Sequence, residues 1–177
     1  SAPAIESATR ARQSTRVNLT QPVYVPPRRG APLTRVGGGT RGSHDQLPLV
    51  SVITPEHTGL VATPQPRLYW YLSTAIHTRF ECGLVNDMEI EPIIEVTFDE
   101  GMQPGFNHID LAEHGVTLQP GIAYQWSVAL VQDPLQRSAD IVSSGRIEYV
   151  EPRAALKEQL KVASPLQAVQ LLAAAGY

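Results

Sequence analysis

The sequence predicts an all-β protein: an immunoglobulin-like antiparallel β-sandwich with an extended N-terminal arm and a short C-terminal helical hairpin. Three observations lead to this fold class. Short apolar runs follow one another through residues 47–151, each bounded by Pro, Gly, Asn or Asp. No long helical period interrupts these runs, which excludes the crossover helices of a parallel sheet. In residues 152–177 the apolar residues change to helical spacing.

The chain begins with a polar segment and a strand-like arm. Residues 1–16 are small and polar without periodicity, and we interpret them as a flexible leader. Residues 17–46 form a basic arm. Its first part alternates apolar with other residues, and the apolar row is Val17, Leu19, Val23 and Val25. Pro22 has no N–H to donate, which favours an edge strand. Such a strand is suited to addition to a sheet edge of its own chain or of a neighbouring copy.

The second part of the arm combines arginines with consecutive glycines. The residues that we expect to contact a partner or an anion are Arg28, Arg29, Arg35, Gly37, Gly38, Gly39 and Arg41. Consecutive glycines can form a nest of backbone N–H groups for a carboxylate, and arginine can make a forked contact with it. The spacing is not that of a phosphate-binding GxxxxGK[ST] loop, so we expect no nucleotide there.

Charge is distributed unequally along the chain. Residues 1–46 contain seven arginines against Glu6 and Asp45, a net charge of +5. Because the whole chain carries −3, the remainder carries −8, and the two parts attract within a chain or between copies. Nucleic acid is not an expected partner, since the acidic body repels phosphate and no aromatic residues are interleaved with the arginines.

The apolar runs of residues 47–151 predict about seven strands of a two-sheet sandwich. They are expected at residues 49–53, 68–72, 78–85, 93–98, 106–111, 124–131 and 141–150. Thr54 and Pro55 end the first run, and a loop through Gly59 is expected to follow. The alternation around Trp70 and Trp126 places both indoles on inward faces, as core residues.

The last part of the chain predicts two helices. In the first, expected over residues 153–161, Leu156 and Leu160 lie four positions apart. Ser164 followed by Pro165 is a typical start for the second helix. The apolar stripe of that helix and its expected C-terminal cap are Leu166, Val169, Leu172 and Gly176. Because the stripe is narrow, we expect the hairpin to pack on the sandwich or on a partner.

No motif indicates catalysis, a metal site or a cofactor. The five histidines lack both the helical i, i+4 spacing and an HExxH motif. No serine lies in a GxSxG elbow, and Cys82, the one cysteine, has no recognisable reactive context. We therefore expect a protein that is not an enzyme. No apolar run approaches the roughly twenty residues that span a bilayer, so we expect no transmembrane segment.

Four motifs carry a resemblance to a known family. They read VYVPPRRGAPLTRVGGGTRG, TPEHTGLVATPQPRLYWYLS, LQPGIAYQWSVALVQDP and RSADIVSSGRIEYVEP. Over about residues 22–152 the chain resembles the uncharacterised bacterial family known as domain of unknown function 928. The resemblance implies an exported bacterial protein and brings no activity, cofactor or catalytic residue. Members continue beyond the helices in a segment resembling GIWYDAL, so we expect a trimmed C-terminus at Tyr177.

The expected function is a non-enzymatic, extracytoplasmic interaction or assembly module. Its expected partners are proteins, including other copies of itself, and the polar start of the chain resembles a processed N-terminus of a periplasmic, surface or secreted protein. An alternative is a small-molecule or glycan-binding sandwich that uses residues 57–66 and 99–105 with Tyr69 and Tyr71. A hydrolase is a third and less favoured hypothesis.

Overall fold

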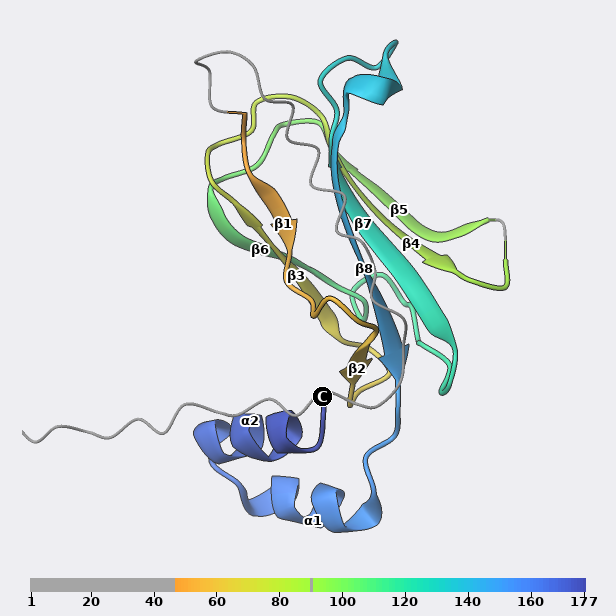
Figure 1. The fold of residues 1–177 in the computed structure, drawn as a ribbon, viewed down its shortest axis with the longest axis vertical. Helices are drawn as coiled ribbons and strands as arrows, with labels where there is room; N and C mark the ends of the chain where they lie inside the picture. The colour runs from red at the N-terminus through yellow and green to blue at the C-terminus, as the bar shows by residue number, and fades with distance from the viewer. Residues whose placement is uncertain (1–46, 90) are drawn as a thin grey trace, which may run out of the picture.

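Two facing β-sheets and two short helices make up the part of the protein that the structure describes (Figure 1). The structure, a computed structural model, describes residues 47–89 and 91–177. In chain order the elements are β1 (Val50–Val52), β2 (Gly59–Val61), β3 (Arg67–Leu72), β4 (Phe80–Asn86), β5 (Pro92–Phe98), β6 (Gly105–Asp110), β7 (Ala123–Leu130), a 3-10 turn (Arg137–Ala139), β8 (Ile141–Tyr149), α1 (Ala154–Val162) and α2 (Pro165–Ala174).

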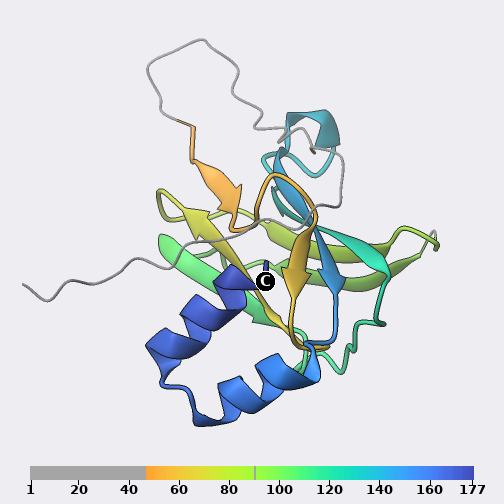
Figure 2. The same cartoon turned by 60° about the horizontal axis from the view of Figure 1, so that its bottom comes forward.

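The strands form a small sheet of order β1-β3-β6 and a large sheet of order β2-β8-β7-β4-β5. The prediction of a mostly-β sandwich followed by a helical hairpin is confirmed. Figure 2 brings one end of the sheets forward and shows α1 and α2 lying across that end. The leader and the strand predicted at residues 17–25 lie outside the described residues.

The strand β2 corrects two predictions. A loop was expected through Gly59, and the sandwich was expected to be antiparallel throughout, but β2 pairs in parallel with β8, with Val61 opposite Tyr149. The chain crosses from the small to the large sheet without turning back, so β2 runs in the direction of β8 (Figure 1). Gly145 of β8 leaves room for this crossing, because a Cβ there would lie 2.3 Å from Cγ2 of Thr54.

The core lies between the sheets and is apolar. The side chains of Trp70 and Trp126, which the alternation placed on inward faces, are 0% and 1% exposed. The Trp70 ring stacks on Phe80 with 5.7 Å between ring centroids. Among the described residues no polar or charged residue is buried. Burial of each large side chain contributes roughly 1.5–3 kcal/mol, so this layer dominates the stability of the fold.

Tyr124 connects β7 to the segment that precedes it. Its ring is buried in the core, while its hydroxyl oxygen accepts a hydrogen bond of 2.9 Å from the backbone N–H of Gln119. A buried tyrosine needs such a partner for its hydroxyl. The bond fixes the Pro120–Gly121 turn, where Gly121 has a φ of 76° that suits glycine.

Local sequence signals define the ends of α2. Ser164 and Gln167 form the capping box at its start, with Pro165 as the first helical residue, so the predicted cap is confirmed. At the other end Gly176 has a φ of 89°, and the N–H of Tyr177 donates to the carbonyl of Leu172 over 3.0 Å. This is a Schellman ending, and it turns Tyr177 back toward the sandwich.

The predicted apolar stripe of α2 is only partly covered. The described residues leave Leu166 and Val169 about half exposed, at 50% and 51%. Leu171 instead lines the space between the hairpin and the sandwich, as does Leu156 of α1. The side that faces the sandwich therefore includes Leu171, which the predicted stripe did not contain.

Candidate functional site

The predicted arm site lies outside the described residues. That set comprises Val17, Leu19, Val23, Val25, Arg28, Arg29, Arg35, Gly37, Gly38, Gly39 and Arg41. The described residues show what such an arm could meet. Three surfaces stand out: the free edge of β5, the outer face of the small sheet, and a cavity under the hairpin.

The free edge of β5 is the longest edge of the large sheet. Among the described strands, β5 hydrogen-bonds to β4 alone, with Phe98 opposite Phe80 and Ile94 opposite Leu84. Alternate N–H and C=O groups on its other side therefore point away from the sheet, where they can pair with an added strand. The opposite edge strand, β2, has only three residues.

Acidic side chains surround this edge. They lie within β5 and in the segments on either side of it, and they are Glu89, Glu91, Glu95, Asp99 and Glu100. Asp99 is the one member with an ion pair among the described residues, a 3.9 Å contact with Arg79. The other four have no described basic partner, so the edge carries net negative charge.

Several other carboxylates of the sandwich form ion pairs with arginine. Glu81 on β4 lies 3.0 Å from Nε of Arg79 and 2.6 Å from Nη2 of Arg137. The Arg137 hydrogen bond lowers the pKa of Glu81, against the opposing effect of desolvation. Asp110 at the edge of the small sheet likewise lies 2.7 Å from Arg67. Glu56, Glu113, Asp133 and Glu148 also lack a described ion pair, but they are scattered over the sandwich, whereas four such carboxylates gather within and beside β5.

The outer face of the small sheet carries a row of aromatic rings. Tyr69 packs against His108 and Tyr71 against Phe106, with centroid distances of 5.3 and 5.4 Å. Each pair joins β3 to β6 at directly opposite register positions. Phe106 is 74% exposed and Tyr69 40% exposed. An exposed aromatic face of this kind marks a binding surface more often than an ordinary solvated one.

The two loops expected to form a glycan site lie apart. Residues 57–66 lead into Arg67 at the start of β3, whereas Gly105 at the end of the 99–105 loop pairs with Leu72 at the other end of that strand. A six-residue strand is about 20 Å long, so the loops do not form one pocket. The structure brings Tyr69 and Tyr71 together with β6 instead.

Cys82 and the potential metal ligands of the described residues can be placed in the structure. Cys82 is buried, and this burial raises the pKa of its thiol to about 12, so it is protonated and unreactive at neutral pH. No group of three or more His, Cys, Asp or Glu within the described part of the chain could hold a metal ion. No described helix is long and apolar enough to cross a membrane.

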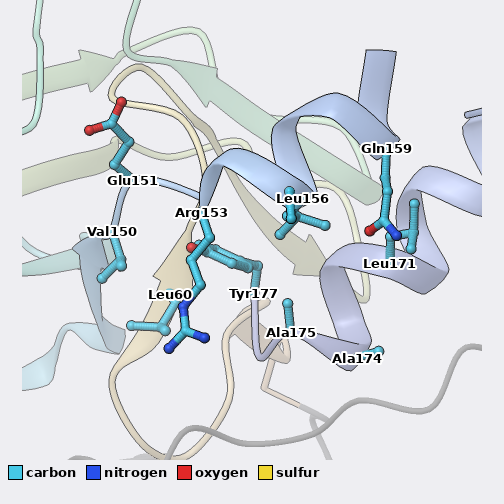
Figure 3. Close-up of a pocket in the computed structure, with 11 residues that line it drawn as sticks. Leu60, Val150, Glu151, Arg153, Leu156, Gln159, Leu171, Ala174, Ala175 and Tyr177 are labelled. Carbon is cyan, nitrogen blue, oxygen red and sulfur yellow. The ribbon is translucent and has the colours of Figure 1, made fainter. Parts of the chain in front are cut away.

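A cavity of about 690 Å³ lies between the helical hairpin and the end of the large sheet (Figure 3). Leu60 of β2 and Val150 form one wall, and Leu156 and Leu171 form the other. Tyr177 lies between the walls. The sequence did not predict this cavity.

The family assignment follows from a family model described as Domain of Unknown Function (DUF928), which matches residues 36–177. The chain belongs to this family. The match confirms the resemblance seen in the sequence but covers a different range, because it includes the hairpin and begins within the arm. No curated protein and no solved structure matches the chain.

The three surfaces of this DUF928 protein lie within the matched residues, and none is a contiguous sequence motif. The β5 edge depends on strand order, and the aromatic rows depend on the register between β3 and β6. The cavity combines residues of β2, of the β8–α1 connection and of both helices. One sequence signal was available for the aromatic face, namely Tyr69 and Tyr71 opposite the inward row of Trp70.

Proposed function

We propose that this DUF928 protein is a non-enzymatic, extracytoplasmic interaction or assembly module whose N-terminal arm adds as a strand to the β5 edge of a neighbouring copy. The observation that carries the proposal is the free, seven-residue edge of β5 with its uncompensated carboxylates. The family resemblance supports the extracytoplasmic location.

The backbone and the apolar pattern of the two segments are compatible. The arm residues 17–25 alternate apolar and other side chains, and a short strand of this kind is unstable alone. On the edge of β5 its N–H and C=O groups would find partners. Ile93, Val96 and Phe98 of β5 are only partly buried and would gain apolar neighbours.

Charge complementarity selects β5 over the other edges. The arginine-rich residues 26–46 follow the apolar row directly, and the carboxylates without basic partners lie at both ends of β5. Each exposed ion pair contributes only about 0–1 kcal/mol, so the charges guide and orient the arm more than they hold it. The strand pairing supplies the affinity.

We further propose that the sandwich has immunoglobulin-like topology. In that topology one sheet contains strands A, B and E, and the other contains G, F, C and C′. The order β1-β3-β6 and the order β8-β7-β4-β5 support this correspondence. The hydrogen bond from Gln119 to the Tyr124 hydroxyl, at the start of β7, supports it as a tyrosine corner.

Light scattering after size exclusion tests the assembly. The full chain is compared with Val23→Glu/Val25→Glu, which places charges in the apolar row, and with Asn18→Glu/Thr20→Glu, which adds the same charge on the opposite side of the strand. We expect concentration-dependent oligomers in the wild type and the control, and monomers in the first variant. Oligomers that survive the first variant, or a wild type that is monomeric at every concentration, contradict intermolecular strand addition.

The aromatic face favours a second candidate function, the binding of a glycan. Apolar faces of sugar rings pack on exposed tyrosine and phenylalanine rings, and Tyr71 and Phe106 present such rings on a sheet. Calorimetric titration with cellohexaose and with an N-acetylglucosamine hexamer tests this candidate. Binding that Phe106→Ala abolishes, and that Leu135→Ala leaves unchanged at a distant exposed position, supports it; no binding of either sugar to the wild type removes it.

A further inference from the structure

We propose that the cavity between the hairpin and the sandwich binds a small apolar carboxylic acid, with its alkyl chain between the two walls and its carboxylate at Arg153. The described lining of this cavity contains no residue of β5. Its lining comprises Leu60, Val150, Glu151, Arg153, Ala155, Leu156, Gln159, Leu171, Ala174, Ala175 and Tyr177.

The walls of the cavity are apolar and only partly covered. No residue of α1 or α2 is buried by the described part of the chain, although both helices turn leucines toward the sandwich. A second hollow of about 220 Å³, lined by Pro55 and Gly59, shares Leu60 and Tyr177 with the first. The two hollows adjoin at these two residues, and the leucines, valine and proline that line them suit an alkyl chain better than a polar molecule.

The charge at the cavity is positive. Lys157 is paired with Glu151, and Lys161 is 2.6 Å from Glu158, so both hairpin lysines have acidic partners. Arg153 has no ion pair with any described residue. Figure 3 shows Arg153 beside Tyr177 within the cavity, while the carboxylate of Glu151 is directed away from them. A ligand that neutralises this site therefore carries one negative charge.

Tyr177 can complete the contact with the carboxylate. Burial raises the pKa of its hydroxyl above the ordinary value of 10.0, outweighing the smaller opposite effect of Arg153. The hydroxyl is therefore protonated at neutral pH and can donate a hydrogen bond. In Figure 3 the Tyr177 hydroxyl lies near the aliphatic part of Arg153, and the guanidinium extends beyond it. A carboxylate accepts hydrogen bonds on both oxygens and can therefore use a guanidinium and a hydroxyl as donors.

The size of the space sets the length of the acid. Cavities of about 300–1,000 Å³ hold ordinary small ligands, and this cavity falls within that range. Each buried methylene strengthens binding about fourfold. Affinity should therefore rise from hexanoate through octanoate to decanoate, which distinguishes an enclosed alkyl chain from a carboxylate that only touches the surface.

Calorimetric titration of the full chain with decanoate, and with 1-decanol as the uncharged molecule of equal length, tests the site. We expect the wild type to bind one decanoate per chain. Arg153→Gln should bind decanoate at least about tenfold more weakly than the wild type, because a charge-assisted hydrogen bond is lost. Lys161→Gln removes a hairpin charge that does not line the cavity and should leave binding unchanged. 1-Decanol should bind the wild type and Arg153→Gln equally.

Two bulky substitutions on α1 distinguish binding in the cavity from binding to other apolar surfaces. Ala155→Phe fills the cavity and should weaken the binding of decanoate at least about tenfold. Ala154→Phe lies next to it on α1 but outside the lining, and it should leave decanoate binding unchanged. Both positions are exposed, so both variants should keep the wild-type circular dichroism and melting curve. The proposal is overturned if the wild type shows no saturable binding, or if Arg153→Gln or Ala155→Phe binds decanoate as the wild type does.

Discussion

The sandwich and the helical hairpin are built on opposite principles. In the sandwich, large side chains such as Trp70, Phe80 and Trp126 are almost wholly excluded from water. In the hairpin, no residue of α1 or α2 is buried, and a cavity separates the helices from the sheet. The contrast places most of the stability in the sheets and leaves the hairpin free to adjust to a ligand.

Helix length sharpens this contrast. The helices α1 and α2 have nine and ten residues, which is shorter than the about 12–15 residues that an isolated helix needs to be even marginally stable in water. Caps and the contacts of Leu156, Leu171 and Tyr177 must therefore supply what the helices lack. Ligand binding in the cavity would add further contacts at the place where the fold has fewest.

The largest expected effect is the removal of a core indole. Trp126→Ala should lower the free energy of unfolding by about 3–5 kcal/mol, since it opens a cavity between the sheets. Leu171→Ala removes a partly exposed side chain of the hairpin and should cost about 1 kcal/mol or less. Urea denaturation of both variants measures the difference. Equal losses of unfolding free energy in the two variants would contradict the claim that the sandwich contributes most of the stability.

The next effect lies where the chain crosses between sheets. Gly145→Ala places a Cβ against Thr54 and should cost about 1–3 kcal/mol through overpacking. Gly83→Ala is the matched control, because the atom nearest to its new Cβ is 3.7 Å away. Thr54→Ser removes the methyl group and should restore part of the loss in the double variant. If thermal melts show that Gly83→Ala destabilises the protein more than Gly145→Ala, the contact with Thr54 does not explain why residue 145 is glycine.

A smaller effect is expected from the cap of α2. Ser164→Ala removes the side-chain acceptor for the N–H of Gln167 and should destabilise the helix by about 1 kcal/mol. Hydrogen exchange should then accelerate in α2 while the amides of β7 keep their protection. Faster exchange in both elements would mean that the hairpin and the sandwich unfold as one unit.

The smallest effect concerns Glu81, and it depends on pH. Because Arg137 lowers the pKa of Glu81 below the ordinary value of 4.5, the ionised form is favoured in the folded protein. Its stabilisation, up to about 1 kcal/mol, is present above the unfolded pKa and is lost as the pH falls through the folded pKa. Glu81→Gln should therefore be less stable than the wild type at neutral pH and equal to it in acid. A stability difference between the two proteins that grows toward low pH would contradict the predicted direction of the effect.

Patterns of neighbouring residues were readable from the sequence. Alternation located the strands around Trp70 and Trp126, and Ser164 with Pro165 marked the start of α2. The strand β2 was missed because three residues are too few to show a period, and its parallel pairing depends on the distant contact between Thr54 and Gly145.

The candidate surfaces were less readable, because each depends on positions far apart in the chain. That β5 is an edge follows from the strand order, and that Tyr71 meets Phe106 follows from the register of β3 with β6. The cavity needs Leu60 and Tyr177 to converge from opposite ends of the described chain. The arm predictions remain predictions, since their residues lie outside the described part of the chain.

The central claim is that the arm occupies the free edge of β5, and hydrogen exchange of the β5 amides tests it most directly. The amides of residues 93–98 are followed in the full chain and in Val23→Glu/Val25→Glu, with β7 as the internal reference. We predict that alternate β5 amides exchange slowly in the wild type and quickly in the variant, while β7 is unchanged. The same fast exchange along β5 in both proteins would contradict the claim.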